Sequence, residues 1–309
     1  MGDVVHALPA LNDMLAQRPG LQVHWLVEPP FAPIVALHPG VQRVWPLRWR
    51  KWRRALHRAA IWREMAALRR ELQAQRFDLV LDLQGLLKSV CWARLAGGAV
   101  VAGADWPSAR EGLASLLYDR RASAPWGEHA VQRSRMLAAA HLGYALPTTP
   151  PDFGLRPAPA VWPAPTPCAV LIPNASRPEK LWPQAHWVAV GQRMQAQGWT
   201  PVVLWGSGAE HALATRIAQA CGGVLPPFLG VGEMAAVLAP ARLIVGLDTG
   251  FTHLGAALGR PTIGIYCDHE PSNAGITGPG GVASIGGIGQ RPSLEAVLAL
   301  VDQRIAAAG

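Results

Sequence analysis

Two loops in the second half of the chain carry residue types that suit the binding of an anionic group. One loop follows the apolar run 243–247 and leads through a glycine into a helix pattern, and its candidate residues are Asp248, Thr249, Gly250, Phe251 and His253. The free N–H groups and the positive dipole end of such a helix bind anions without a metal. The other loop, 172–183, contains Lys180, whose ammonium group suits a phosphate.

Each of these residues also has an ordinary structural interpretation. Asp248 or Thr249 suits a helix N-cap, His253 on its own is more often structural than a ligand, and Lys180 suits a solvated surface. Glu210, which follows the glycine turn 206–208, suits a hydrogen bond to a ribose or a favourable position near a helix dipole. Spacing alone leaves both interpretations open.

Two segments of the first half have residues suited to an acceptor hydroxyl. Asp3 stands at the start of the first helix pattern, where it is either a cap or a general base that takes a proton from the acceptor. The strand pattern ending at Asp82 is followed by Gln84 and Lys88, which suit acceptor contacts or an ordinary capped loop.

A strongly basic segment runs from Arg43 to Arg76. It holds eleven Arg or Lys residues against two acids, and its four tryptophans are Trp45, Trp49, Trp52 and Trp62. Tryptophan beside arginine favours the headgroup layer of an anionic membrane. A solvated helical face and a groove for single-stranded nucleic acid are the alternatives.

Short apolar runs alternate with longer amphipathic stretches along both halves, as parallel βαβ units require. We expect strands at 23–27, 41–45, 77–83, 99–102, 169–172, 201–205, 243–247 and 262–265. We expect helices at 5–16, 61–75, 131–142, 184–197, 209–220, 233–238 and 252–258, and a last amphipathic helix from Leu294 to Ile305.

A proline-rich stretch divides the two halves. Five prolines fall within residues 156–167, which excludes helix and central strand and favours an extended linker. We therefore predict domains at 1–155 and 168–309 that face a ligand cleft, with sites at the carboxyl ends of the strands. A doubly wound domain starts with a strand, whereas the chain opens on a turn and helix pattern, so the first strand is expected to be absent.

Composition limits the class of protein. Half of the 309 residues are apolar and the net charge is +8, which fits a folded protein with an anionic partner. The four cysteines are widely spaced, so a disulfide framework or zinc cluster is not expected and a reducing cytosol fits. The sequence shows neither a signal peptide pattern nor a spanning segment, so any membrane role is predicted to be peripheral.

The motifs taken together resemble the family 9 glycosyltransferases, most closely the lipopolysaccharide heptosyltransferases that add the first heptose. The resemblance covers nearly the whole chain and rests on segments that occur in family order, namely 1–4, 8–11, 24–28, 31–35, 38–41, the basic Trp-Arg segment, 82–89, 180–183, 248–250 and 253–254.

This resemblance implies a fold, a reaction and roles for the residues. The fold is GT-B, with two Rossmann-like domains. The reaction is the inverting transfer of L-glycero-D-manno-heptose from ADP-heptose to the Kdo residue of Kdo-lipid A at the cytoplasmic face of the inner membrane, with no metal, cofactor or nucleic acid. Asp3 is then the base, the donor contacts are Lys180, Glu210, Asp248, Thr249, Gly250, Phe251 and His253, and the acceptor contacts are Arg48, Arg50, Lys51, Arg53, Arg54, Gln84 and Lys88.

Two alternatives remain open at this point. One is another family 9 transferase that adds a later sugar of the core. The other is an inactive protein that binds anionic lipid or nucleic acid through the basic segment. Acceptor preference separates the first from the main hypothesis, and binding that depends steeply on salt without turnover would favour the second.

Overall fold

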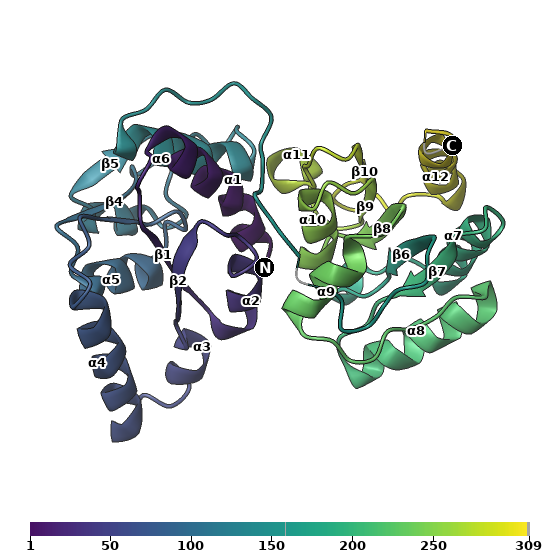
Figure 1. Cartoon of the computed structure of the whole chain (residues 1–309), viewed down its shortest axis with the longest axis horizontal. Coiled ribbons are helices and arrows are strands. Elements are labelled where there is room, and N and C mark those ends of the chain that lie inside the picture. The colour runs from purple at the N-terminus through teal and green to yellow at the C-terminus, as the bar shows by residue number, and fades with distance from the viewer. Residues whose placement is uncertain (158, 308–309) are drawn as a thin grey trace. The chain divides into compact units, whose positions relative to one another are not determined.

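The chain forms two compact units in the computed structural model, which describes residues 1–157 and 159–307. The C-terminal unit consists of residues 1–5, 36–39 and 150–309, and the N-terminal unit of 6–35 and 40–149. Figure 1 follows the chain through both by colour. The limits predicted from the proline-rich stretch, 1–155, 156–167 and 168–309, stay a prediction.

Helices and parallel strands alternate through the first half of the chain, as predicted. Its elements in order are α1 (Gly2–Gln17), β1 (Val23–Val27), η1 (Pro29–Phe31), α2 (Ala32–Val35), β2 (Val41–Pro46), α3 (Trp49–Trp52), α4 (Ala59–Gln73), β3 (Leu79–Leu81), α5 (Leu87–Ala96), β4 (Val100–Ala104), η2 (Gly112–Leu117), β5 (Arg120–Ala122) and α6 (Ala130–Leu142).

The strands of the N-terminal unit form two separate parallel sheets. One sheet pairs β1 with β2, and the other has the order β3-β4-β5. One buried cluster connects the two sheets with α3, α4 and α5, and it includes Trp45, Trp52, Ile61, Leu72 and Trp92. The strands predicted for this half therefore do not form one sheet, because β1 and β2 are separate from β3, β4 and β5. The strand predicted at 77–83 is shorter than expected and consists of the three residues of β3.

The second half continues the alternation in one sheet. Its elements are β6 (Cys168–Ile172), η3 (Pro178–Lys180), α7 (Gln184–Gln195), β7 (Thr200–Val203), α8 (Gly208–Cys221), α9 (Val231–Leu238), β8 (Leu243–Leu247), α10 (Gly250–Ala257), β9 (Thr262–Tyr266), α11 (Pro271–Ala274), β10 (Val282–Gly286) and α12 (Leu294–Ala306).

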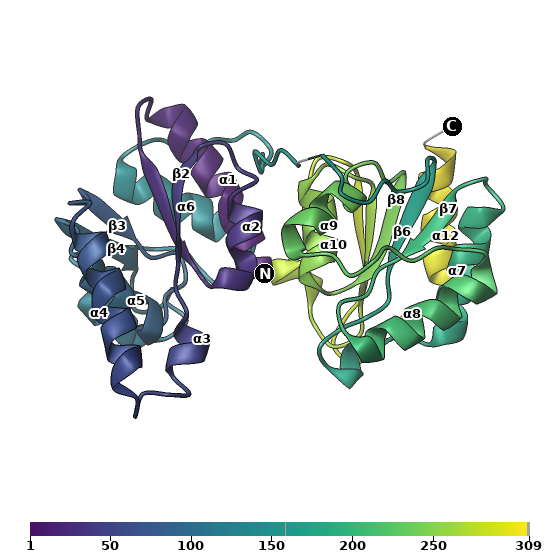
Figure 2. The same ribbon diagram turned by 60° about the horizontal axis from the view of Figure 1, so that its bottom comes forward.

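The sheet of the C-terminal unit is parallel, with the order β10-β9-β8-β6-β7. Helices α7, α8 and α12 cover one face, and α9 and α10 cover the other (Figure 2). The strands β6, β8 and β9 are buried along their full length, as expected for parallel strands covered on both faces.

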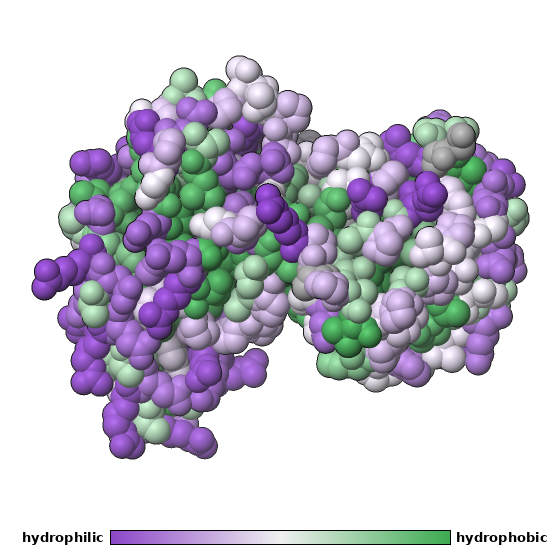
Figure 3. Space-filling model, in the orientation of Figure 1, coloured by the Kyte–Doolittle hydropathy of each residue, from purple (hydrophilic) through white to green (hydrophobic). Residues whose placement is uncertain are grey.

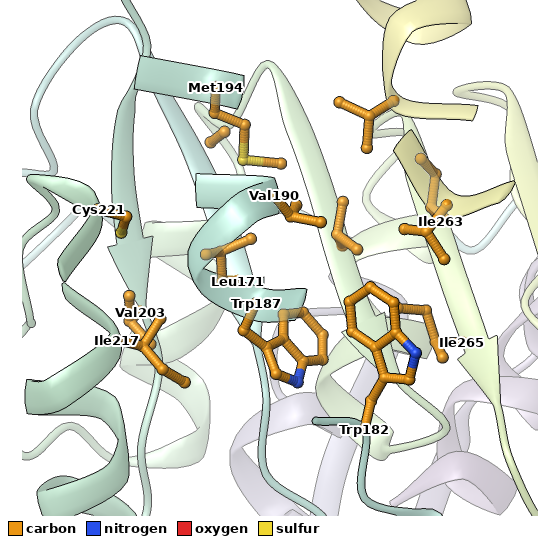
Figure 4. Packing of buried hydrophobic residues seen from close by; sticks show 14 of the residues in the cluster. Leu171, Trp182, Trp187, Val190, Met194, Val203, Ile217, Cys221, Ile263 and Ile265 are labelled. Carbon is orange, nitrogen blue, oxygen red and sulfur yellow. The ribbon is translucent and has the colours of Figure 1, made fainter. Parts of the chain in front are cut away.

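The core of this unit lies between the sheet and α7. Trp182, which precedes α7, and Trp187 meet edge to face with ring centroids 5.3 Å apart, and the buried cluster continues along α7 through Val190 to Met194 (Figure 4). The indole N–H of Trp182 donates to the carbonyl of Pro292, which fixes the chain just before α12. This packing holds the loop after β6, which carries Lys180, against a rigid support.

Candidate active site

The strand order of the C-terminal unit creates a switch point between β6 and β8. The chain leaves β6 toward β7 on one side, and it leaves β8 toward β9 on the other. Ile172 and Gly246 are paired at the carboxyl ends of the two strands. The loops that follow them diverge there, and ligands of doubly wound folds bind in such a crevice.

Lys180 and Asp248 meet across this switch point. The Lys180 ammonium, at the end of η3, forms an ion pair with Oδ2 of Asp248 and lies 3.5 Å from the Asp248 carbonyl. On the other side of the carboxylate, Nε2 of His253 lies 3.3 Å from Oδ1. The structure therefore brings together three residues that the sequence placed on two loops.

The environment of Asp248 keeps its carboxyl ionised. Burial on its own would raise the pKa, but the hydrogen bonds from His253 and Lys180, together with the charge of Lys180, hold it well below its ordinary value. A fixed negative charge thus lies beside the only lysine of the site, and Lys180 keeps donors available for a second oxygen ligand.

The start of α10 supplies backbone donors next to this pair. Thr249 is the N-cap residue, but its side chain makes no capping hydrogen bond, and the Asp248 carboxylate faces Lys180 and His253 instead. The alternative of a side-chain cap is therefore wrong for both residues. The first N–H groups of a helix, here those of Gly250 and Phe251, have no partner within the helix and point at whatever lies before it.

Gly246 and Thr252 fix the position of this helix start. The Thr252 hydroxyl donates to the Leu247 carbonyl at 2.5 Å, and it also lies 3.3 Å from the Thr249 hydroxyl. A Cβ added to Gly246 would approach Thr252 Oγ1 to 2.3 Å, so the absence of a side chain there makes room for the threonine. Sequence reasoning did not single out Thr252, whose spacing from Leu247 was its only signal.

Glu210 has a structural partner in the loop after β7. Its carboxylate accepts the N–H of Gly206 at 2.7 Å, and Ser207 Oγ accepts the N–H of Glu210 at 3.3 Å. These two bonds cap α8 reciprocally. The ribose role of Glu210 stays a prediction.

A second ion pair joins the loops after β6 and β9. Arg177 lies 2.9 Å from Asp268, and both side chains are partly exposed. The Asn174 amide also donates to the Leu204 carbonyl at 3.1 Å, which connects the loop after β6 to β7. These contacts depend on strand order, which the residue pattern alone does not specify.

In the N-terminal unit, Asp82 organises the loop that carries Gln84 and leads into the first turn of α5, which carries Lys88. Its buried carboxylate accepts the N–H groups of Gln84 and Gly85 and the hydroxyls of Ser89 at 2.6 Å and Tyr118 at 2.7 Å. Gln84 is half-buried and Lys88 is exposed. Tyr118 lies 36 residues further along the chain, so no local signal pointed to it.

The basic segment divides into a buried and an exposed part. Trp45 and Trp52 lie in the core of the N-terminal unit with 2% exposure, so the expectation that these two rings face a membrane is wrong. The cause is that their positions in β2 and α3 face α4 and α5. Trp62 is 56% exposed, and Figure 3 shows mainly hydrophilic residues over α3 and α4.

The predicted acceptor residues of this segment also differ from one another. The Lys51 ammonium pairs with Glu64 at 3.0 Å, and the Trp52 indole N–H donates to the same carboxylate. The Trp52 and Lys51 hydrogen bonds lower the pKa of Glu64. Lys51 is therefore paired within the chain although it is exposed. The predicted acceptor arginines of this segment are also exposed, namely Arg48, Arg50, Arg53 and Arg54.

Asp3 is the second residue of α1, and its side chain is exposed. Within residues 1–157 and 159–307, the structure holds no cluster of three or more His, Cys, Asp or Glu side chains that would bind a metal ion. Over the same residues, the helices are too short or too polar to cross a membrane.

Two α/β units with parallel sheets fit the GT-B fold, and the solved structures that match the chain include heptosyltransferases of this fold. A family model described as glycosyltransferase family 9 (heptosyltransferase) matches residues 65–296. The chain belongs to this family, and the resemblance inferred from its motifs is confirmed.

Similar proteins narrow the comparison. The chain is 42% identical over 287 residues to lipopolysaccharide heptosyltransferase 1 of Pseudomonas aeruginosa, which covers 92% of this chain and 80% of that protein. The structure of E. coli heptosyltransferase WaaC with ADP matches with a TM-score of 0.90 and 36% identity over 98% of this chain and 97% of that one. WaaC with ADP-2-deoxy-2-fluoro heptose matches with a TM-score of 0.88 and 36% identity over 98% and 96%.

Proposed function

We propose that this glycosyltransferase transfers L-glycero-D-manno-heptose from ADP-heptose to the Kdo residue of Kdo-lipid A, with inversion at the anomeric carbon. The observation that carries the proposal is the ion pair of Lys180 with Asp248 at the switch point, beside the start of α10. Similarity to a lipopolysaccharide heptosyltransferase 1 and to WaaC bound to ADP and a fluorinated ADP-heptose supports this substrate class.

The donor is assigned to the domain at 168–309. Lys180 and the N–H groups from Thr249 to Phe251 bind the diphosphate and stabilise the charge that develops as ADP leaves. Asp248, held by His253, binds hydroxyl groups of the sugar, and Glu210 binds the nucleoside. A preorganised lysine and helix start need no metal for this role.

The acceptor is assigned to the predicted domain at 1–155, of which residues 1–5, with Asp3, are grouped with the C-terminal unit in the structure. Asp3 is the general base that takes the proton of the Kdo hydroxyl as its oxygen attacks the anomeric carbon and the bond to ADP breaks. Gln84, Lys88, Arg48, Arg50, Arg53 and Arg54 bind the anionic acceptor. Lys51 joins this set only by exchanging Glu64 for an acceptor anion.

The proposed place of action is the cytoplasmic face of the inner membrane, with peripheral association. The basic segment supports this, because its exposed arginines around α3 and the exposed Trp62 suit anionic headgroups.

The experiment measures transfer from ADP-heptose to purified Kdo-lipid A, and the mass of the product is determined by mass spectrometry. A mass increase of one heptose is expected. Heptosylated core is the second acceptor in the same assay, and transfer to it alone would instead assign the chain to a later step of the core. Binding to anionic polymers without turnover on either acceptor would contradict the proposal.

A further inference from the structure

Large apolar side chains are exposed in one segment of the N-terminal unit that no role assigned above uses. Trp106 is 53% exposed, Leu113 is 56% exposed and Leu116 is 59% exposed. Leu87, the first residue of α5, and Leu117 are each 39% exposed. Single exposed apolar residues are ordinary, but a cluster on a folded unit marks a binding surface.

The local geometry turns these residues outward together. Leu113 and Leu116 lie three residues apart in η2, and side chains at this spacing eclipse one another in a 3-10 helix. Ala114 and Tyr118 take the inward positions and pack in the core with Val90 and Val101. The Trp106 ring extends the outward face, because a Cβ added to Gly112 at the start of η2 would lie 2.9 Å from it.

Two hydrogen bonds connect this surface to residues 82–88, which include Gln84 and Lys88. The Glu111 carboxylate, one residue before η2, accepts the N–H of Leu87 at 2.6 Å. The Glu111 N–H in turn donates to the Gly85 carbonyl at 2.9 Å. A ligand that binds to residues 82–88 therefore lies next to the exposed apolar side chains of η2, which these hydrogen bonds hold in place.

The charges around the surface favour an anionic layer rather than a neutral one. Lys88 and Arg110 are exposed beside it. Asp119 pairs with Arg94 at 2.7 Å, whereas Glu111 accepts the Leu87 N–H and keeps its charge. Residues 105–121 together with Lys88 and Arg94 hold five cations against three acids, so the surroundings are net basic. Tryptophan and leucine flanked by lysine and arginine are typical of surfaces that enter the headgroup and upper acyl region of a bilayer.

We propose that Trp106, Leu113 and Leu116 form a wedge that enters an anionic lipid bilayer and presents the 82–88 loop to a lipid-linked acceptor. This inference rests on the proposed function, because the acceptor assigned to that loop is anchored in a membrane. The wedge acts by lowering the distance between loop and membrane, and it touches neither donor nor reacting atoms.

The test combines vesicle binding with two acceptors. The full chain and the double variant Leu113→Ser/Leu116→Ser are sedimented with vesicles of phosphatidylcholine and phosphatidylglycerol. Ile288→Ser is the matched control, because Ile288 is a 68% exposed apolar residue outside the segment. Activity is then measured with Kdo-lipid A in the same vesicles and with its fully deacylated, water-soluble form.

We expect the double variant to have a vesicle affinity that is lower by about tenfold or more, because two leucine side chains no longer enter the lipid. Its KM for the vesicle acceptor rises, while kcat and KM for the deacylated acceptor match those of the parent chain and of Ile288→Ser. Equal vesicle binding by the parent and the double variant would overturn the proposal. A parent chain that is a dimer and a double variant that is a monomer would also overturn it, because the surface would then bind a second copy of the chain.

Failure of the proposed function has a different signature. A parent chain that transfers heptose to neither acceptor refutes the function, while the vesicle binding of the double variant still decides whether the wedge exists. Binding of single-stranded nucleic acid that the double variant loses, without vesicle binding by the parent, would also overturn the wedge.

Discussion

The ammonium of Lys180 is paired with the carboxylate of Asp248 across the crevice between β6 and β8. The two residues are 68 positions apart in the chain, and their side chains are only 17% and 12% exposed. In the proposed donor complex, the diphosphate either shares Lys180 with Asp248 or takes the place of the Asp248 carboxylate. The pair keeps the lysine oriented before the donor binds, which reduces the ordering that binding requires.

Lys180→Met is expected to lower kcat/KM by about 10²- to 10³-fold, because the site loses the positive charge aimed at the leaving diphosphate. Calorimetric affinity for ADP falls as well. Arg242→Met is the matched control, since it removes one positive charge from an exposed position of the same unit. Equal activity of the two variants would contradict the phosphate role.

Asp248 predicts a pH dependence of stability. Its pKa is lower in the folded chain than the ordinary value of about 3.9. Such a carboxyl binds more protons when unfolded, so its stabilisation is fully present above about pH 5 and is lost as the pH falls through the ordinary value toward the folded one.

Asp248→Asn should therefore lower the free energy of unfolding at pH 7 by about 2 kcal/mol, the loss of charge-assisted hydrogen bonds. Urea unfolding at pH 7 and pH 3 measures the difference between parent and variant. The difference should shrink at pH 3. A difference of the same size at both pH values would show that the charge of Asp248 does not stabilise the fold.

The sequence predicted the donor loops but not their partners. Continuous apolar runs identify β6, β8 and β9 to within about one residue, because strands buried on both faces are continuous apolar segments. The meeting of Lys180 with Asp248 depends on β6 and β8 being neighbours, and residue pattern alone does not specify strand order. β10 was not expected, since glycines flank its short and half-buried run.

The first half shows the limits of composition more clearly. Helix α5 is not expected from the sequence, because apolar residues such as Leu87 and Cys91 also lie on its exposed side and weaken the helical period. The tryptophans at 45 and 52 look like interface residues beside so many arginines, yet tertiary packing buries them. The carboxylate of Asp82 was noticed only as the end of a strand.

Asp3→Asn is expected to reduce transfer by about 10²- to 10⁴-fold, the usual contribution of a general base. The asparagine has nearly the same shape and lies at an exposed position in the first turn of α1, so the helix should persist. Product formation and ADP affinity are measured on the same preparation. ADP affinity should remain unchanged, and a parallel loss of both would assign Asp3 a structural role.

Tyr118→Phe tests how Asp82 supports the acceptor loop. The Tyr118 hydroxyl donates to Asp82 at 2.7 Å, and both side chains are buried. Burial and the Asp82 charge raise the pKa of Tyr118 far above its ordinary value, so the tyrosine stays a donor at every pH at which the protein is folded. Phenylalanine fills the same space but leaves Asp82 with three of its four donors.

We expect this variant to lose about 1.5–3 kcal/mol of unfolding free energy, as for a hydrogen bond to a buried charge. The KM for the acceptor should rise as the 82–88 loop loosens, and the KM for ADP-heptose should not. Tyr144→Phe is the control, because within the described residues its hydroxyl has no hydrogen-bond partner and its loss should cost little. If chemical denaturation gives the same stability for both variants, the Tyr118 bond does not hold the loop, and the position of Lys88 must depend on the other contacts of Asp82 and on Glu111.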